Sequence, residues 1–104
     1  MVDYEVADRE GEVATLLLRG ELVGDIESKQ IEHSLERHYV DDGVKLIEVD
    51  LSQLEQINLE GIAILLELWS ASRARGKRFQ TRGASGQVLD KLTVAGVASL
   101  LSQG

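Results

Sequence analysis

The residues best placed for chemistry lie where a polar loop runs into the most apolar stretch of the chain. Asn58, Leu59, Glu60 and Gly61 come directly before this stretch, and Ile62 begins it. The first turn of a helix has unpaired backbone N–H groups and carries the positive end of the helix dipole. Such a junction can bind an anion, carry a modification or contact another protein. We therefore take these five residues as the candidate partner-binding site.

Residue types that support metal binding or covalent catalysis are poorly arranged. His33 and His38 are five residues apart, so they do not share a helix face as ligands at i and i+4 would. We interpret both as surface residues. Asp41, Asp42 and Asp50 could bind a cation, but a helix end and a strand end explain them more simply. The chain has no cysteine, and no spacing supports a Ser-His-Asp set or paired carboxylates, so we expect no catalytic residue, metal or cofactor.

Two further groups have simpler interpretations than a binding site. The Gly-Ala-Ser-Gly loop at residues 83–86 lacks the Gly-Lys-Ser/Thr ending of a phosphate-binding loop, and we expect Ser85 to cap a short helix. A basic group is interpreted as a solvated helix end, although it could contact an acidic partner surface. Its members are Arg73, Arg75, Lys77, Arg78 and Arg82.

The composition bounds the possible functions. A chain of 104 residues with 43% hydrophobic residues is enough for one domain, which we place at residues 1–104. The net charge of -7 argues against a nucleic-acid partner and fits either simple solubility or a basic protein partner. No apolar run approaches the ~18 residues that span a bilayer, so we expect no membrane insertion. The polar N-terminus does not read as a secretion signal, and we expect a cytoplasmic protein.

Hydrophobic periodicity predicts the elements that position the candidate site. We expect the order strand-strand-helix-strand-helix-strand-helix, with the last residues, 97–101, undecided between a strand and a helical turn. The fold class is α/β, with a mixed four- to five-stranded sheet and helices packed mainly on one face. The predicted strands cover residues 2–6, 13–19, 44–51 and 78–82, and the predicted helices begin near Asp25, Asn58 and Ser85.

The spacing of apolar residues also predicts which faces are buried. The strands at 13–19 and 44–51 are apolar at alternate positions on both faces, which indicates buried, central strands. Asp25 is expected to cap the first helix, which buries Ile31, Leu35 and Tyr39. The short helix after Ser85 is expected to bury Val88, Leu89 and Leu92. The long helix is expected to bury Ile62, Leu65, Leu66 and Trp69, with a second stripe of Ile64, Leu68 and Ala71.

Several short motifs, taken in order, resemble those of the STAS domain, a family named for sulfate transporters and anti-sigma factor antagonists. They are Gly20-Glu21-Leu22, Asp50-Leu51-Ser52, Asn58 to Gly61 before a long apolar helix, Gly76 after it, and Gly96-Val97. The resemblance implies a small sheet with helices on one face. It also implies a switch or scaffold module and not an enzyme.

The resemblance also identifies a departure at the candidate site. In anti-sigma factor antagonists the long helix starts with Asp-Ser-x-Gly, and phosphorylation of the serine by the partner kinase, the anti-sigma factor, releases the antagonist. Here Asn58 and Leu59 stand at the aspartate and serine positions, and only Gly61 matches. Val23 also replaces an acidic family residue after Gly20-Glu21-Leu22. Leu59 has no hydroxyl, so the family's phosphoryl transfer cannot occur there.

From these observations we expect a non-catalytic module that binds an anti-sigma factor or kinase-like protein. Leu59 would be an apolar anchor in a constitutive interface. Two other interpretations remain. Glu60 could mimic the charge of a phosphorylated state, or the region could be purely structural, with Asn58 capping the helix, Glu60 complementing its dipole and Leu59 packing locally.

Two alternative functions follow from the same sequence. STAS subunits also occur in membrane transport systems, including phospholipid ABC transporters, where they contact the ATPase subunit. A nucleotide could instead bind at the start of the long helix, although the motif is poor. A homodimer and phosphorylation of another hydroxyl, such as that of Ser52, also remain open.

Overall fold

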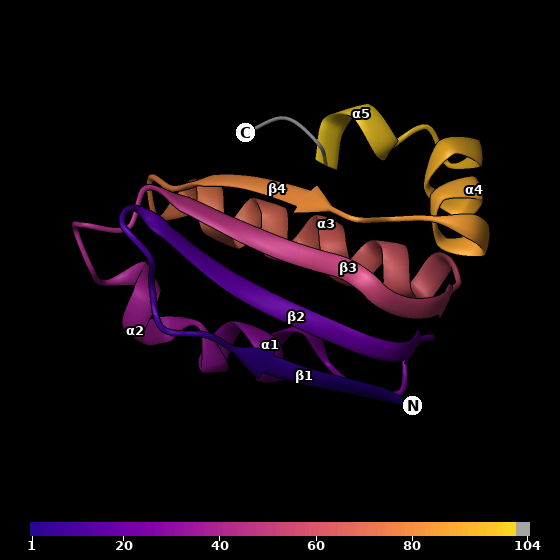
Figure 1. Cartoon of the computed structure of the whole chain (residues 1–104), viewed down its shortest axis with the longest axis horizontal. Coiled ribbons are helices and arrows are strands. Elements are labelled where there is room, and N and C mark those ends of the chain that lie inside the picture. Colours follow the sequence, from indigo (N-terminus) through magenta and orange to yellow (C-terminus); the bar gives the residue numbers. More distant parts are fainter. Residues whose placement is uncertain (102–104) are drawn as a thin grey trace.

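The computed structural model describes residues 1–101 of the chain, which form four strands and five helices (Figure 1). In chain order they are β1 (Val2–Val6), β2 (Val13–Leu22), α1 (Ser28–Ser34), α2 (Glu36–Tyr39), β3 (Leu46–Ile57), α3 (Leu59–Ala74), β4 (Arg78–Arg82), α4 (Gly86–Val94) and α5 (Ala98–Leu101).

The four strands form one mixed sheet in the order β1-β2-β3-β4. β1 runs antiparallel to β2, whereas β2, β3 and β4 are parallel to one another. Helices α1 and α3 are the crossovers between these parallel strands, and both lie against the same face of the sheet (Figure 1). The predicted fold class, the mixed sheet and the one-sided packing of helices are confirmed.

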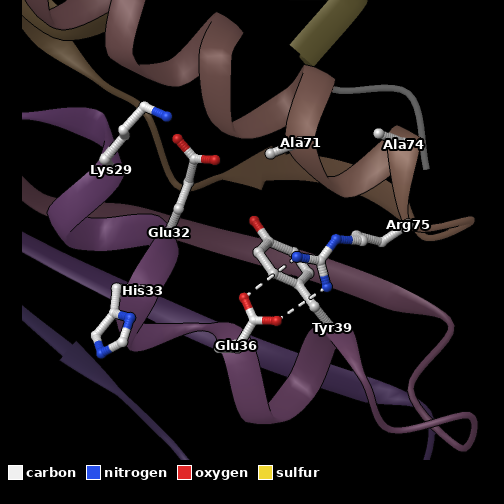
Figure 2. Close-up of a pocket in the computed structure, with 8 residues that line it drawn as sticks. All are labelled: Lys29, Glu32, His33, Glu36, Tyr39, Ala71, Ala74 and Arg75. Carbon is white, nitrogen blue, oxygen red and sulfur yellow. Dashed lines mark hydrogen bonds and ion pairs between the residues drawn. The ribbon is translucent and has the colours of Figure 1, made fainter.

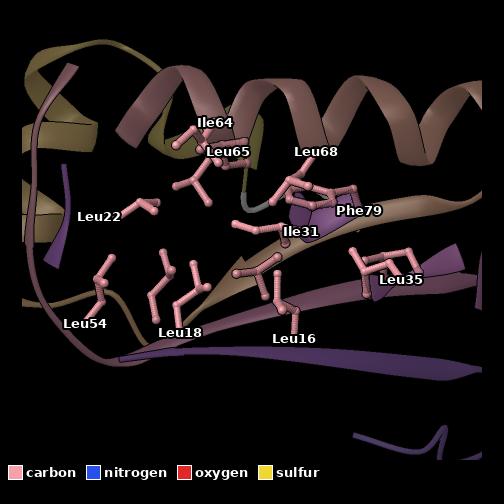
Figure 3. Packing of buried hydrophobic residues seen from close by; sticks show 14 of the residues in the cluster. Leu16, Leu18, Leu22, Ile31, Leu35, Leu54, Ile64, Leu65, Leu68 and Phe79 are labelled. Carbon is pink, nitrogen blue, oxygen red and sulfur yellow. The ribbon is translucent and has the colours of Figure 1, made fainter. Parts of the chain in front are cut away.

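One face of the central strands supplies the hydrophobic core. Leu16 and Leu18 of β2 point toward the helices, where they pack with Ile31 of α1 and with Leu65 and Leu68 of α3 (Figure 3). All five side chains are fully buried. Because successive side chains of a strand alternate between faces, every second residue reaches this layer in the first part of β2 and β3, up to Leu18 and Leu51.

The prediction that both faces of the central strands are buried is wrong for the opposite face of the sheet. The alternation in residues 13–19 and 44–51 was expected to bury both faces, but among the described residues no helix covers the second face (Figure 1). Val13, Thr15 and Leu17 of β2 are therefore only half-buried. β2 and β3 are nevertheless the two central strands, as predicted.

Ion pairs run across this open face from strand to strand. Arg19 of β2 donates to Asp3 of β1 at 3.1 Å. Toward the other edge of the same face, Arg82 of β4 contacts Glu48 at 2.6 Å and Asp50 at 3.2 Å, both on β3. Opposite charges on neighbouring strands stabilise their pairing and keep this face polar.

Two helix boundaries differ from the sequence prediction. The first helix begins at Ser28, with Glu27 as N-cap, and Asp25 instead lies 3.8 Å from the N-terminal amine. The helix is also broken at Leu35 into α1 and α2. The stripe of Ile31, Leu35 and Tyr39 is buried as predicted, because the break keeps these side chains on the same side.

The C-terminal segment differs in detail. Ser85 is the N-cap of α4 but its side chain makes no capping hydrogen bond, and Leu89 is 43% exposed although it was expected to be buried. The undecided segment at 97–101 contains a helical turn, α5. Gln87 extends the sheet, because its side-chain amide donates to the carbonyl of Ile57 and accepts from its N–H, both at 2.9 Å.

Asp50 is the carboxylate most affected by this architecture. Partial desolvation raises the pKa of Asp50, but hydrogen bonds from the hydroxyl and amide of Ser52, together with the charge of Arg82, outweigh it and leave the pKa below its usual value. A carboxyl group whose pKa is lowered by folding stabilises the folded state above its unfolded-state pKa. That contribution disappears as the pH falls through the folded-state value.

We therefore expect Asp50→Asn to lower the free energy of unfolding at pH 7. The difference from the unmodified chain should shrink as the pH falls below about 4, where the unfolded-state carboxyl group begins to protonate. Urea unfolding at pH 7, 4 and 3 measures it. Asp42→Asn is the matched control, because Asp42 is exposed and has no ion pair among the described residues. A difference that is constant over this pH range would contradict the assignment.

Candidate functional site

The start of α3 is tied to the end of β2 by the side chain of Asn58. Asn58 has an extended backbone and is the N-cap, since its Oδ1 accepts from the N–H of Gly61 at 2.9 Å. Its Nδ2 donates to the carbonyl of Val23 at 3.2 Å. One amide thus caps the helix and holds the β2–α1 loop. The predicted capping role of Asn58 is present in the structure.

Gly61 lies where α3 approaches the end of β2 most closely. A Cβ atom at this position would collide with the backbone carbonyl of Leu22 and with the side chain of Ile57. The glycine is needed for close packing and not for an unusual backbone conformation, because Gly61 is an ordinary helical residue. This contact fixes the rotation of the first turn.

Leu59 consequently points away from the core. With Gly61, Leu65, Leu68 and Ser72 facing inward, a helical repeat of 3.6 residues places Leu59 on the outer side. Its side chain is 77% exposed. Local packing of Leu59, one of the structural interpretations of the sequence, does not occur.

The five candidate residues have unequal access to solvent. Glu60 is exposed and Asn58 is half-buried, whereas Gly61 and Ile62 are buried beneath the first turn. Only the first three positions can therefore contact another molecule directly. Gly61 and Ile62 would position that surface without touching a partner.

A groove that the sequence analysis did not predict lies beside this turn. It has a volume of about 330 Å³ and separates the start of α1 from the side of α3. Glu60, Ile64 and Glu67 of α3 line it at a spacing of four and three residues, which is the signal that could have identified the helix face. The other lining residues are Gly24, Ile26, Glu27, Ser28 and Lys29.

The groove and its surroundings account for most of the chain's net negative charge. Residues 21–29 and 55–67, which frame the groove and the first turn of α3, contain six carboxylates and one lysine. Their net charge of −5 compares with -7 for the whole chain. A basic surface would therefore be attracted to this end of the molecule.

A second hollow, of about 400 Å³, includes none of the predicted site residues (Figure 2). Its lining residues on α3 follow those of the groove by about ten positions, or roughly 15 Å along the helix. Arg75 donates to both carboxylate oxygens of Glu36 there, at 3.1 and 3.3 Å, and stacks over the Tyr39 ring. Burial raises the pKa of Tyr39, outweighing the hydrogen bond with Ser72 and leaving the phenol neutral at physiological pH. Glu36 and Arg75, two of the charged groups in this hollow, are therefore already paired with each other.

Two predictions about polar residues need correction. His38 was interpreted as a surface residue, but it is only 4% exposed and its Nε2 donates to the carbonyl of Ala7 at 3.1 Å. Lys77 was placed in a solvated basic cluster, but it is buried and donates to the carbonyls of Asp41 and Val44. Both side chains can be buried because backbone carbonyls of a neighbouring segment accept their hydrogen bonds.

Within residues 1–101, no group of three or more His, Cys, Asp or Glu side chains is arranged to hold a metal ion. No helix within the same range has the length and apolar character needed to cross a membrane.

Comparison with known proteins identifies the family and the fold. The family described as "Mlab, STAS domain" matches residues 6–102. The unphosphorylated anti-sigma factor antagonist SpoIIAA superposes with a TM-score of 0.75 at 17% identity, covering 97% of this chain and 86% of that one. An anti-sigma factor antagonist from Mycobacterium paratuberculosis gives 0.68 at 17% identity, covering 97% and 83%.

The same fold occurs inside a larger transport protein. The murine anion transporter Slc26a9 superposes with a TM-score of 0.72 at 19% identity, covering 89% of this chain but 15% of the transporter. A comparison with curated protein sequences finds no significant match. At these identities the structural matches establish the fold alone.

Gly61→Ala should destabilise the protein by about 2 kcal/mol, because the added methyl group forces α3 away from Leu22 and Ile57. Urea unfolding followed by circular dichroism measures the loss. Ser70→Ala, at an exposed position of the same helix, is the control and should change stability by less than about 0.5 kcal/mol. Equal stability of Gly61→Ala and the unmodified chain would show that this contact is not tight.

Proposed function

Because the chain belongs to the STAS domain family, we propose that it is a non-catalytic protein-binding module that acts like an anti-sigma factor antagonist. One observation carries the proposal. Leu59, a large apolar side chain at the first position of α3, is 77% exposed on a turn that is otherwise held rigidly by Asn58 and Gly61. An exposed apolar residue on a rigid support is typical of an interface anchor.

The binding proposed here is constitutive. Leu59 occupies the position of the family's phosphorylated serine and has no acceptor oxygen, so a kinase cannot modify this residue. The neighbouring Glu60 packs over Gly24 of the same chain, where a Cβ atom would meet its carboxylate. Since Glu60 contacts its own loop and carries about half the charge of a phosphate group, we favour a binder over a mimic of the phosphorylated state.

The proposed partner is an anti-sigma factor or another kinase-like protein, met in the cytoplasm. A second candidate is the ATPase subunit of a membrane transport system. The fold of the family described as "Mlab, STAS domain" is not restricted to anti-sigma factor antagonists, because it also occurs within the Slc26a9 transporter. This occurrence supports the second candidate. Both candidates use the fold as a docking module, so they are separated by the identity of the bound protein.

Leu59→Asp should abolish binding of the partner because a charged side chain cannot enter an apolar pocket. Isothermal titration calorimetry against a purified kinase-like anti-sigma factor and a purified transport ATPase from the same genome measures the loss and separates the candidates. Val94→Asp is the matched control, since Val94 is 86% exposed but lies on α4. Binding that survives Leu59→Asp, or that Val94→Asp weakens equally, would sink the proposed docking site.

Leu59→Ser should restore a phosphoacceptor if the partner is a kinase of the anti-sigma type. After incubation with that partner and ATP, mass spectrometry should find one added phosphate on the variant at residue 59 and none on that residue in the unmodified chain. The serine hydroxyl would be as exposed as Leu59 is now. A variant that binds a kinase-active partner but stays unmodified would count against the antagonist-like geometry.

A further inference from the structure

The groove beside the first turn of α3 combines apolar walls with a rim of carboxylates. Ile64, which is almost completely buried, and the half-buried Ile26 provide the apolar lining. Glu27, Glu60 and Glu67 line the same groove, and all three are exposed. This combination matches a long cationic side chain, which has an apolar stem and a charged end.

The three glutamates are among the carboxylates of the described residues that form no ion pair, so an incoming cation would not have to displace an internal one. Elsewhere Asp3, Glu36 and Glu48 each pair with an arginine. Among residues 1–101, no lysine or arginine forms an ion pair with Glu27, Glu60 or Glu67. The hydroxyl of Ser28 donates to Glu67, which holds that carboxylate in the groove.

We propose that the groove lined by Ile26, Ile64, Glu60 and Glu67 receives one arginine or lysine side chain of the partner protein. This inference rests on the proposed function and extends it, because it states the chemistry of the partner. The partner surface would carry an apolar pocket for Leu59 and, next to it, a basic side chain that enters the groove.

The positions of the two contacts make one continuous interface. Leu59 and Glu60 are consecutive residues, so the apolar anchor and the rim of the groove lie on adjacent sides of the same helical turn. The net charge of −5 around this turn would accelerate the encounter with a basic surface. Arginine fits better than lysine, because its planar group can donate to two carboxylates at once.

Lys29 is the one cation that lines the groove among the described residues, and its positive charge lowers the affinity for an entering cation. It is exposed and lines the groove without pairing with any of the three glutamates among the described residues. Its charge opposes entry of a second cation at short range. Removal of this charge should therefore strengthen binding, which gives a test of opposite sign to removal of the carboxylates.

The hollow in Figure 2 is a weaker candidate for the same role. There Arg75 already occupies the position of an entering cation, since it pairs with Glu36 and covers Tyr39. An external arginine would have to displace an internal one. The groove at Glu60 has no such internal occupant.

The test needs no knowledge of the partner. The ¹⁵N-labelled full chain is titrated with N-acetyl-arginine-methylamide, and the neutral isostere N-acetyl-citrulline-methylamide is the matched ligand control. Saturable shifts of the amides of Gly24, Ile26, Glu60 and Ile64 are expected with the arginine compound and not with citrulline. Shifts of equal size and affinity with citrulline would overturn the proposal.

Three variants sharpen the result. Glu60→Gln combined with Glu67→Gln should weaken arginine binding about five-fold, as expected for the loss of two partly exposed charge pairs. Lys29→Gln should strengthen it about two-fold. Glu10→Gln combined with Asp42→Asn removes two exposed carboxylates outside the groove and should leave the affinity unchanged. Equal weakening by both double variants would mean that only net charge matters, and the groove assignment would fail.

The two proposals fail separately. Leu59→Ser should leave binding of the arginine compound unchanged, because Leu59 does not line the groove. If Leu59→Asp spares partner binding while the groove still binds arginine, the docking role of Leu59 is wrong and the groove's chemistry stands. If the arginine compound does not bind while Leu59→Asp abolishes partner binding, the groove proposal alone is wrong.

Discussion

The close seating of α3 on the end of β2 is the contact on which the candidate site depends. Gly61 allows the first turn of the helix to touch the carbonyl of Leu22, and Asn58 fixes the same turn from the other side through Val23. These contacts set the orientation of the helix about its axis. The outward direction of Leu59 and the position of Glu60 over Gly24 are therefore consequences of packing at Gly61.

The long helix was the element that could be predicted best from the sequence. Its start at Asn58 and its inward-facing Leu65 and Leu68 follow from a capping residue and a 3.6-residue period, both of which are local signals. The family motif identified position 59 as that of the phosphorylated serine, which the hydrophobic periodicity cannot indicate. Exposure of Leu59 could be expected only because its neighbour Gly61 had to face inward.

The parts that could not be predicted all depend on contacts between distant segments. The alternation of apolar residues in β2 shows that two faces exist but not whether a helix covers the second, and Leu17 is half-buried for that reason. His38 is buried because Ala7, which follows β1 and lies 31 residues earlier in the chain, accepts its hydrogen bond. The groove likewise requires the β2–α1 loop to lie against α3. Nothing in the sequence around Glu67 indicates that the hydroxyl of Ser28 donates to it.

The charge around α3 gives a physical reason for a leucine at position 59. A phosphate there would add about two negative charges to a surface that already carries a net −5, so the modified state would repel the carboxylates of Glu60 and Glu67. An apolar side chain avoids this repulsion and leaves the surrounding carboxylates free to attract a basic surface from a distance. Attraction between exposed charges acts from a distance and is screened by salt, whereas burial of Leu59 requires contact and is not screened. The two features therefore act at different stages of binding. The carboxylates would set the rate of association, and the leucine would set the lifetime of the complex.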